Sequence, residues 1–570
     1  MKSMGSRARA LFLSLVMIIT MIPQSSIVYG VENEEPLQVE VKYDFANNDS
    51  GSAYGSITVN ANKEGVYYFY WGDSEGKKLT NNGVEYSELG WCQATESKSE
   101  NTIKGTYKVI SPYTAIPEGA KELLVYYKDS KDADAVYKIP DNKVFNGGSS
   151  SYRFGIMSDI HYNRYSDYSE DDSVPAFDNA LKFLNDQKID FVGMTGDLSK
   201  SSETSAFTKF QTAVNKYPDI TVYTCMGNHD DYNINDFNKY VNTKKSTDSR
   251  IKSINDTGVD FVFEYHGDIY IFFSQTRWDY FTDKSYLVAP EQLNWLEKNL
   301  NTYANRNVYL FFHTYLASEN GDITTAVGNL KNPGGYTYDL TYRFGNADER
   351  RFRSLLNKYP NVTMFSGHSH WAYSQQIYNP NLNIGNIKSD NSGATLLHIS
   401  SVGDPRIIGE NEAKRTELNG QASEGTIATK YPNCTVYTGV DFKNSKLLAY
   451  ATYMNYDGKK STPVSAMKVG KTKITSVGKV KKVSKKSKKY KVKIKYKKIM
   501  GAVGYQIQYS TGKKFKQSKT KTKTSKKTGY TITKLKKNTK YYIRVRAYGT
   551  QFGDRVYGQW SKKKKVKTKK

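Results

Sequence analysis

Between residues 152 and 370, five short apolar runs each end just before a loop that carries aspartate, asparagine or histidine. The runs are Arg153–Met157, Phe191–Met194, Thr221–Cys225, Val308–Phe312 and Val362–Phe365. Helical patterns fall between several of them, at 176–184, 206–216 and 292–300. Strands that alternate with helices predict an α/β layered domain. Functional side chains of such folds gather in loops at the carboxyl ends of the strands, so we expect these loops to form one site.

The loops hold five of the seven histidines of the chain, together with carboxylates and one amide. In order they are Asp159-Ile-His161, Gly196-Asp197, Gly227-Asn228-His229-Asp230, His313 and Gly367-His368-Ser-His370. Imidazoles, carboxylates and an amide oxygen suit Zn²⁺, Mn²⁺ or Fe, and the lack of thiolates disfavours a closed structural zinc site. A carboxylate can bridge two cations, which can hold a phosphate between them and lower the pKa of a shared water.

The order and spacing of these motifs resemble those of the calcineurin-like metallophosphoesterase superfamily over about residues 152–400. The resemblance implies two metal ions (Mn, Fe or Zn) and hydrolysis of a phosphoester by a metal-bound hydroxide. It implies that His229 contacts the phosphate and assists the leaving oxygen, and that Asp230 orients His229. The implied ligands are Asp159, His161 and His370 for one metal, Asn228, His313 and His368 for the other, and Asp197 as the bridge.

Differences from two branches of the superfamily show which branch this sequence resembles less. Purple acid phosphatases carry a Tyr ligand where this chain has Lys200, and Gly where it has His161. Calcineurin-type protein phosphatases have Gly-Asn-His-Glu where this chain has Gly-Asn-His-Asp. The sequence is more similar to the bacterial phosphodiesterase branch, which includes cyclic-nucleotide and glycerophosphodiester hydrolases. We therefore expect a phosphodiesterase. The alternatives are a phosphomonoesterase with the same site, and a surface adhesion protein with a structural metallo-domain.

Alternating strand patterns lie on both sides of this region. Short alternating runs separated by Gly, Asn and Asp predict a β-sandwich within 31–146. Residues 471–570 resemble a fibronectin type III domain, although Tyr496 stands where that family usually has Trp. The expected fold is multidomain: an α/β layered metallophosphoesterase domain at 152–465, flanked by an N-terminal β-sandwich and a C-terminal fibronectin type III-like β-sandwich. The residues that carry the second resemblance are Gly504-Tyr-Gln-Ile-Gln-Tyr-Ser510, Tyr541 as the corner tyrosine, and Gly558-Gln-Trp-Ser561.

Positive charge is concentrated in the last segment. The formal net charge is +27, and residues 471–570 hold 36 of the 83 lysines and arginines but one of the 56 acidic residues, Asp554. The rest of the chain is mildly acidic, so this charge is separate from the predicted catalysis. Two interpretations stay open: a soluble spacer domain, or retention on an anionic cell-wall polymer such as teichoic acid or on a membrane surface. Nucleic acid is disfavoured because no aromatic stacking platform is apparent.

Residues 1–30 read as a secretory signal peptide. Lys2, Arg7 and Arg9 precede an apolar run from Leu11 to Ile22, which is shorter than the about 20 residues that a membrane span needs. An uncleaved membrane anchor is the alternative. Three cysteines do not make a disulfide framework. We expect a secreted or cell-surface protein, a pattern that fits export from a Gram-positive bacterium.

Other chemistry-bearing residues have plainer interpretations. Cys225 lies at the end of a predicted strand and is expected in the core. His266 precedes Gly-Asp and fits a hairpin turn, whereas His398 lies in an apolar run and fits a buried histidine. Asp404 and Arg406 either form part of a turn or approach a phosphate from a loop.

Overall fold

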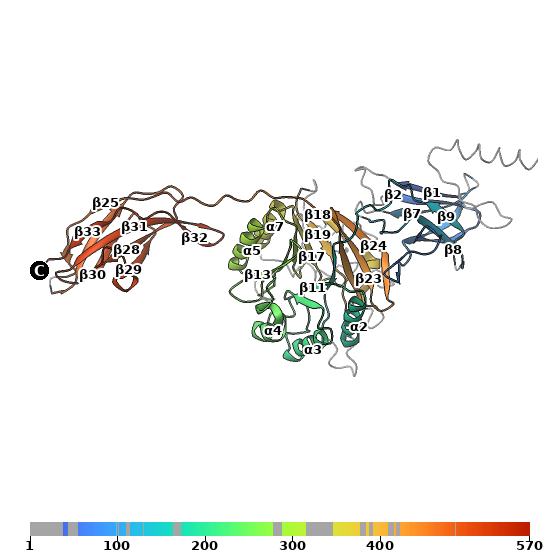
Figure 1. Ribbon diagram of the computed structural model, residues 1–570, viewed down its shortest axis with the longest axis horizontal. Helices are drawn as coiled ribbons and strands as arrows, with labels where there is room; N and C mark the ends of the chain where they lie inside the picture. The colour runs from blue at the N-terminus through green and yellow to red at the C-terminus, as the bar shows by residue number, and fades with distance from the viewer. Residues whose placement is uncertain are drawn as a thin grey trace, which may run out of the picture. The chain divides into compact units, whose positions relative to one another are not determined.

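The computed structural model divides the chain into two compact units, one of residues 1–293 with 303–462 and one of residues 294–302 with 463–570 (Figure 1). The signal peptide predicted at 1–30 lies outside the described residues. Within the described part of the chain, no helix has the length and apolar character needed to cross a membrane. The described residues are 38–43, 55–97, 100, 102–109, 114–128, 130–163, 173–276, 288–314, 346–376, 384–386, 392–408, 415–417, 422–484 and 486–569.

The N-terminal part of the first unit is a seven-stranded antiparallel sheet with the order β1-β2-β7-β6-β3-β8-β9. Its β3 alternates as a period of two requires, with Tyr67, Phe69 and Trp71 buried. β6 pairs with β3 through Gly90–Ala94 and with β7 through Thr95–Ser97. The seven strands thus form one continuous sheet. The N-terminal β-sandwich remains a prediction. The strands are β1 (Gln38–Tyr43), β2 (Gly55–Ala61), β3 (Gly65–Gly72), β6 (Gly90–Ser97), β7 (Thr102–Val109), β8 (Glu122–Tyr127) and β9 (Ala135–Lys138), with a separate hairpin of β4 (Thr80–Asn81) and β5 (Val84–Glu85).

Two further sheets form the central part of the same unit, one of six strands in the order β12-β11-β10-β22-β23-β24 and one of seven in the order β13-β14-β15-β16-β17-β19-β18. The five apolar runs predicted as strands are β10, β11, β12, β16 and β17, which confirms that prediction. β10, β11 and β12 are parallel to one another, and so are β15, β16, β17 and β19. The six-stranded sheet contains β10 (Tyr152–Met157), β11 (Phe191–Met194), β12 (Thr221–Thr224), β22 (Glu424–Lys430), β23 (Cys434–Asp441) and β24 (Lys446–Tyr456). The seven-stranded sheet contains β13 (Ile251–Ile254), β14 (Phe261–Tyr265), β15 (Asp268–Phe272), β16 (Val308–Phe311), β17 (Val362–Ser366), β18 (Ile384–Asn386) and β19 (Thr395–His398).

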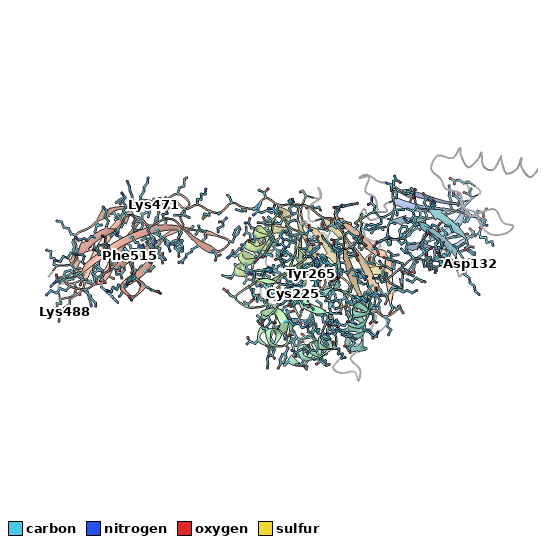
Figure 2. All side chains as sticks on the ribbon, in the orientation of Figure 1. Asp132, Cys225, Tyr265, Lys471, Lys488 and Phe515 are labelled. Atoms are coloured by element: carbon cyan, nitrogen blue, oxygen red, sulfur yellow. The ribbon has the colours of Figure 1, made fainter. Side chains whose placement is uncertain are left out.

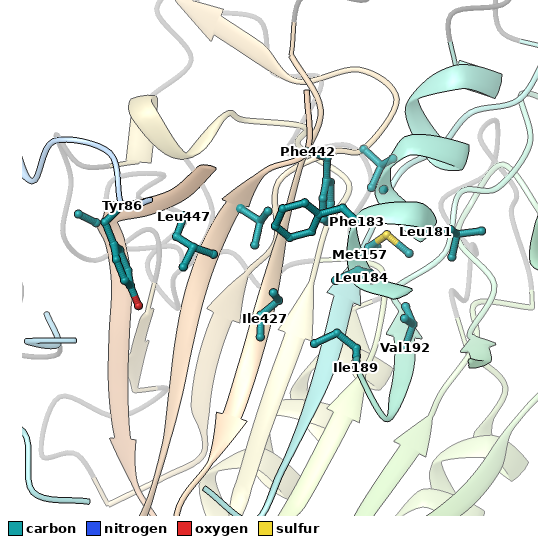
Figure 3. Close-up of a cluster of buried hydrophobic side chains, with 14 of the residues drawn as sticks. Tyr86, Met157, Leu181, Phe183, Leu184, Ile189, Val192, Ile427, Phe442 and Leu447 are labelled. Carbon is teal, nitrogen blue, oxygen red and sulfur yellow. The ribbon is translucent and has the colours of Figure 1, made fainter. Parts of the chain in front are cut away.

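These two sheets share a buried aromatic core. Phe154 of β10 stacks on Phe191 of β11 with ring centroids 5.2 Å apart, and both belong to one cluster with Phe272 of β15 and Phe311 of β16. A second cluster packs α2 against the six-stranded sheet, with Leu184 near β10 and β11 (Figure 3). Strands covered on both faces are mostly apolar, which is why the sequence shows near-continuous apolar runs here. The helices among the described residues are α2 (Ser173–Asp186), α3 (Thr204–Asn215), α4 (Ile234–Tyr240), η1 (Thr243–Ser246), α5 (Pro290–Thr302), α7 (Asn346–Lys358) and α8 (Tyr373–Gln376). β20 (Arg406–Ile408) pairs antiparallel with β21 (Arg415–Glu417).

Residues 471–569 form two sheets around their own core. In one sheet β27 pairs with β25, β26 and β30; in the other the order is β29-β28-β31-β32, with β33 beside β31. The hydroxyl of Tyr541 accepts a 3.0 Å hydrogen bond from the backbone N–H of Lys536, the contact expected of a corner tyrosine. Tyr496 is buried in the core at the place predicted for it. The elements are β25 (Ile474–Val477), β26 (Lys481–Lys482), β27 (Tyr490–Tyr496), β28 (Gly504–Ser510), η3 (Gln517–Lys519), β29 (Thr520–Ser525), β30 (Gly529–Leu535), β31 (Lys540–Gln551), β32 (Asp554–Tyr557) and β33 (Lys564–Lys567).

Candidate metal centre

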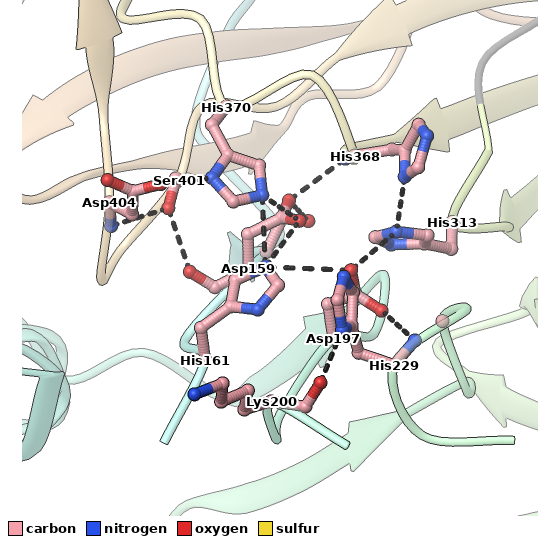
Figure 4. A network of polar contacts seen from close by, with 12 residues as sticks. Asp159, His161, Asp197, Lys200, His229, His313, His368, His370, Ser401 and Asp404 are labelled. Carbon is pink, nitrogen blue, oxygen red and sulfur yellow. Dashed lines mark hydrogen bonds and ion pairs between the residues drawn. The ribbon is translucent and has the colours of Figure 1, made fainter. Parts of the chain in front are cut away.

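The loops that follow β10, β11, β16 and β17 bring six predicted ligands into contact (Figure 4). Two groups could each hold a metal ion, and within each group the ligand atoms lie within 4.8 Å of one another. Asp197 belongs to both groups, and its role as a bridging carboxylate stays a prediction. Asn228, the seventh predicted ligand, is buried in the loop after β12. The first group is Asp159, His161, Asp197 and His370, and the second is Asp197, His313 and His368.

The two oxygens of Asp197 have different partners. Oδ2 lies 3.0 Å from Nε2 of His313 and 3.5 Å from Nε2 of His161. Oδ1 accepts a 2.9 Å hydrogen bond from the backbone N–H of His229. One oxygen therefore faces both groups of imidazoles, while the other anchors the loop of His229. Burial alone would raise the pKa of Asp197, but the surrounding histidines, His313 first, hold it well below its usual range, so the carboxylate is ionised at neutral pH.

Two buried oxygens of the site lack a hydrogen-bond donor. Asp159 Oδ1 lies 3.0 Å from Nε2 of His370 and 3.5 Å from Nε2 of His161, and those two nitrogens are 3.0 Å apart. This oxygen and Oδ1 of Asn228 are buried, and neither has a hydrogen-bond partner among the described residues. Leaving a buried acceptor unsatisfied costs roughly 1–3 kcal/mol. Bound cations would satisfy both of these oxygens. The donor set of this site therefore fits metal ions.

Five of the ligands occupy a backbone region that side-chain-bearing residues rarely adopt. Such residues cost on the order of 1–3 kcal/mol each and cluster at functional sites. Neighbouring glycines make the tight loops possible, because a Cβ on Gly227 would overlap Asp197 and one on Gly367 would overlap Ser158 and Asp159. The φ angles are 55° at Asp159, 54° at His161, 55° at Asp197, 75° at His368 and 62° at His370.

The histidines of the two groups differ in protonation. Burial lowers the pKa of His161 to about 4, and burial together with the charge of His313 lowers that of His368 to about 3. Burial and the nearby Arg406 hold the pKa of His370 well below its usual value. Burial would also lower the pKa of His313, but the Asp197 carboxylate outweighs it and raises the pKa to about 9. At neutral pH three imidazoles are thus ready to bind a metal, and His313 carries an extra proton.

Metal binding at pH 7 is therefore expected to release about one proton per chain, from Nε2 of His313, because a ligand must be deprotonated to bind. Since His313 stays protonated below about pH 9, the affinity of the second group should rise with pH up to that value, by about tenfold per pH unit. Calorimetric titration of the metal-free chain in two buffers of different ionisation enthalpy counts the protons. Metal binding at pH 7 without proton release would contradict the expectation.

His229 is half-buried at the edge of both groups. Its ring centroid lies 4.9 Å from that of His161, and its Nδ1–H donates to the carbonyl oxygen of Lys200. With Nδ1 held by a backbone carbonyl, Nε2 is the nitrogen left to meet a substrate. The ring is thereby fixed in the orientation that a proton donor at Nε2 requires.

The prediction that Asp230 orients His229 needs a correction. The carboxylate of Asp230 accepts hydrogen bonds from the backbone N–H groups of Leu198 at 3.0 Å, Ser199 at 3.1 Å and Gly227 at 3.1 Å. The ring of His229 is instead oriented by Lys200. Asp230 therefore joins the loop after β11 to the loop after β12, and it acts on His229 through the backbone.

Asp404, which the sequence left open, lies behind His370. Its Oδ2 lies 2.7 Å from Nδ1 of His370 and 2.7 Å from Nη2 of Arg406. Ser401 Oγ accepts the N–H of Asp404 and donates to the backbone oxygen of Asp159, both at 2.8 Å. A carboxylate on the far nitrogen of a ligating histidine fixes its tautomer and ring orientation. Asp404 is thus a positioning residue, and the turn of 403–406 was its only signal in the sequence.

Replacing Asp404 with alanine is expected to weaken metal binding about 10–100-fold, because His370 loses the partner that orients it. The Asp404→Asn variant keeps an oxygen acceptor and should lose less. Metal content after dialysis against graded chelator concentrations measures both effects. Equal metal retention by folded Asp404→Ala and wild-type chains would show that the contact does not support the site.

The remaining chemistry-bearing residues have structural roles. Cys225 is buried, with Sγ 3.7 Å from the backbone oxygen of Met194, and burial holds its pKa well above its usual value. His398 is buried with Nε2 2.8 Å from Ser369 Oγ, so it supports the loop of His368 and His370. His266 and Gly267 have φ of 46° and 89° in the hairpin between β14 and β15, the pattern of a type I′ turn.

Comparison with known proteins finds a family model that covers most of the site. Residues 152–372 match the model of the calcineurin-like phosphoesterases. The fn3 domain of the human collagen alpha-1(XX) chain is similar to part of this chain at 9% identity, covering 19% of this chain and 94% of that domain, with a TM-score of 0.13. The chicken CNTN1 FN1-FN3 domains are similar at 19% identity, covering 28% of this chain and 49% of theirs, with a TM-score of 0.15. No curated protein matches the chain.

Proposed function

We propose that this chain uses two metal ions to cleave phosphodiesters. Its residues 152–372 form a calcineurin-like phosphoesterase domain, which makes the chain a metal-dependent phosphoester hydrolase. The observation that carries the proposal is Asp197, whose Oδ2 lies within 3.5 Å of one imidazole from each group. Mn, Fe and Zn all suit the imidazole and carboxylate donors.

The charge of the site supports a diester over a monoester. A phosphodiester carries one negative charge at neutral pH, whereas a phosphomonoester approaches two. Among the described residues around the ligands, the guanidinium of Arg406 is paired with Asp404 rather than directed at a substrate. Apart from the metal ions, we expect His229 to contact a bound phosphate, and the pairing of Arg406 with Asp404 suits the smaller charge of a diester.

The residues of the chain divide the remaining work. When bound, the metal ions polarise the phosphoryl group and activate water. Asp197 holds the two ligand groups together, and Asp404 keeps His370 in its binding tautomer. His229 holds a proton at Nε2 and gives it to the leaving alkoxide, while its Nδ1–H stays bonded to Lys200.

The decisive test compares bis-p-nitrophenyl phosphate with p-nitrophenyl phosphate as substrates of metal-analysed protein. We expect about two metal ions per chain and a higher kcat/KM for the diester. A higher kcat/KM for the monoester would replace the proposal with the phosphomonoesterase. One metal ion per fully active chain would remove the bridging role of Asp197.

We further propose that the protein is exported and retained at the cell surface by residues 471–570. The basic start and apolar run of residues 1–30 support export, and the charge of the last segment supports retention. The mass of the mature protein tests cleavage near residue 30. An intact N-terminus in the membrane fraction would favour the uncleaved anchor. If the full-length chain and a chain without residues 471–570 bind cell walls equally at every salt concentration, residues 471–570 are a spacer domain.

A further inference from the structure

A row of three lysines lies on the outer face of β27. The strand alternates strictly, so Tyr490, Val492, Ile494 and Tyr496 are buried in the core while Lys493 and Lys495 are exposed and Lys491 is half-buried. We name Lys491, Lys493 and Lys495 the lysine row. Other lysines, such as Lys471 and Lys488, also project outward from this unit (Figure 2).

Stability does not explain the lysine row. The residues opposite it in the neighbouring strands are Ser476, Gly529, Thr531 and Lys481, and none is acidic. Lys481 faces Lys491 directly, and like charges placed opposite each other destabilise a sheet. Protection of an exposed edge is not the reason either, because β27 has paired strands on both sides. The lysine row is present although its repulsion from Lys481 destabilises the sheet, which indicates that it binds an anionic partner.

The spacing of the row indicates what kind of anion fits. Residues at every second position of a strand lie about 7 Å apart on one face. A phosphodiester polymer with three carbons between phosphates has six backbone bonds per repeat, as many as two peptide residues, so it also extends by about 7 Å per repeat. Successive phosphates of such a polymer can therefore meet successive lysines of the row.

We propose that the lysine row binds a polymeric phosphodiester of the polyol phosphate type, and that such a polymer is the substrate class of the catalytic domain. The second part rests on the proposed function, because a diesterase needs a diester to cleave. Single-stranded nucleic acid has the same number of backbone bonds per repeat, but its binding proteins add aromatic stacking. The aromatic residues of β27, Tyr490 and Tyr496, are buried on the other face. A bound polymer would keep the enzyme on a substrate with many cleavable bonds.

The test measures binding of the full-length, metal-free chain to poly(1,3-glycerol phosphate), so that cleavage cannot interfere. The triple variant Lys491→Gln, Lys493→Gln, Lys495→Gln is expected to lose about 100-fold in affinity at low salt. The slope of log affinity against log salt should fall by about 2, as for three lost phosphate contacts. The matched control carries Lys562→Gln, Lys563→Gln and Lys565→Gln, which remove the same charge from exposed positions beside the other sheet. We expect the control to lose less than about fivefold.

Each alternative result has a definite meaning. Equal losses in the two triple variants would overturn the lysine row, because general charge would then be sufficient. Tighter binding to phosphatidylglycerol vesicles or to oligothymidylate than to the polymer would overturn the polyol phosphate partner. A metal-loaded chain that cleaves bis-p-nitrophenyl phosphate but leaves the bound polymer intact would overturn the polymeric substrate alone. A chain that cleaves neither diester would overturn the proposed function itself.

Discussion

An Asp197→Ala chain should have no measurable phosphodiesterase activity and should bind neither metal ion. In the wild type, Oδ2 of Asp197 lies near imidazoles of both groups, at 3.0 Å from Nε2 of His313 and 3.5 Å from Nε2 of His161. Without it, the buried histidines have no shared anion to balance two cations. The loss should exceed the about 10²–10³-fold that a single electrostatic contact contributes to kcat. Metal analysis after gel filtration and turnover of bis-p-nitrophenyl phosphate measure both effects.

The Asp197→Asn variant separates the two tasks of this residue. An asparagine oxygen can still accept the backbone N–H of His229, which Asp197 Oδ1 now accepts at 2.9 Å, while its lower charge weakens the bridge. We expect Asp197→Asn to fold as wild type, to bind metal weakly and to be nearly inactive. An Asp190→Asn chain is a control, since Asp190 lies outside both ligand groups. Comparable diester turnover by Asp197→Ala and wild type would refute the bridging geometry.

A His229→Ala chain should keep both metal ions and lose about 10²–10⁴-fold in kcat, the usual contribution of a general acid. The imidazole belongs to neither ligand group, and its Nδ1–H is bonded to Lys200. The loss should be largest for a diester with an alkyl leaving group, which needs a proton from Nε2. It should be smaller for p-nitrophenolate, which is stable as an anion.

The leaving-group comparison distinguishes a proton donor from a residue that only shapes the pocket. Methyl p-nitrophenyl phosphate and a glycerophosphodiester provide the activated and the alkyl leaving group. The His229→Asn variant is the matched control, because its amide can still donate to the Lys200 oxygen without supplying a proton. Equal losses with both substrates would argue against proton donation by His229. Loss of metal from His229→Ala would instead make it a ligand.

Much of the fold could be predicted because its signals are local. The five apolar runs are strands, since strands covered on both faces are mostly apolar along their whole length. The N-terminal region was harder to predict, because period-two alternation shows which side chains are buried but not how β6 divides its pairing between β3 and β7. In β27, buried residues alternate with lysines, so its period of two separates the core face from the lysine face.

The residue types of the candidate site could be predicted from the sequence, whereas the contacts between those residues could be predicted less well. Five ordered motifs predicted seven ligands, and six of those residues lie in the two groups that could hold a metal ion. The roles of Asp230 and Asp404 depended on partners that lie far from them in the sequence. Asp230 faces the backbone of Leu198 and Ser199 rather than the ring of His229. Asp404 reaches His370 across 34 positions.

By itself, the sequence determined which side chains could do metal chemistry, which runs were strands and where the positive charge lies, because each depends on residue type and local spacing. Only the tertiary structure decided which oxygen of Asp197 faces both ligand groups, which carbonyl orients His229 and which carboxylate supports His370. Those choices depend on distances of about 3 Å between loops far apart in the chain, and no local pattern encodes them.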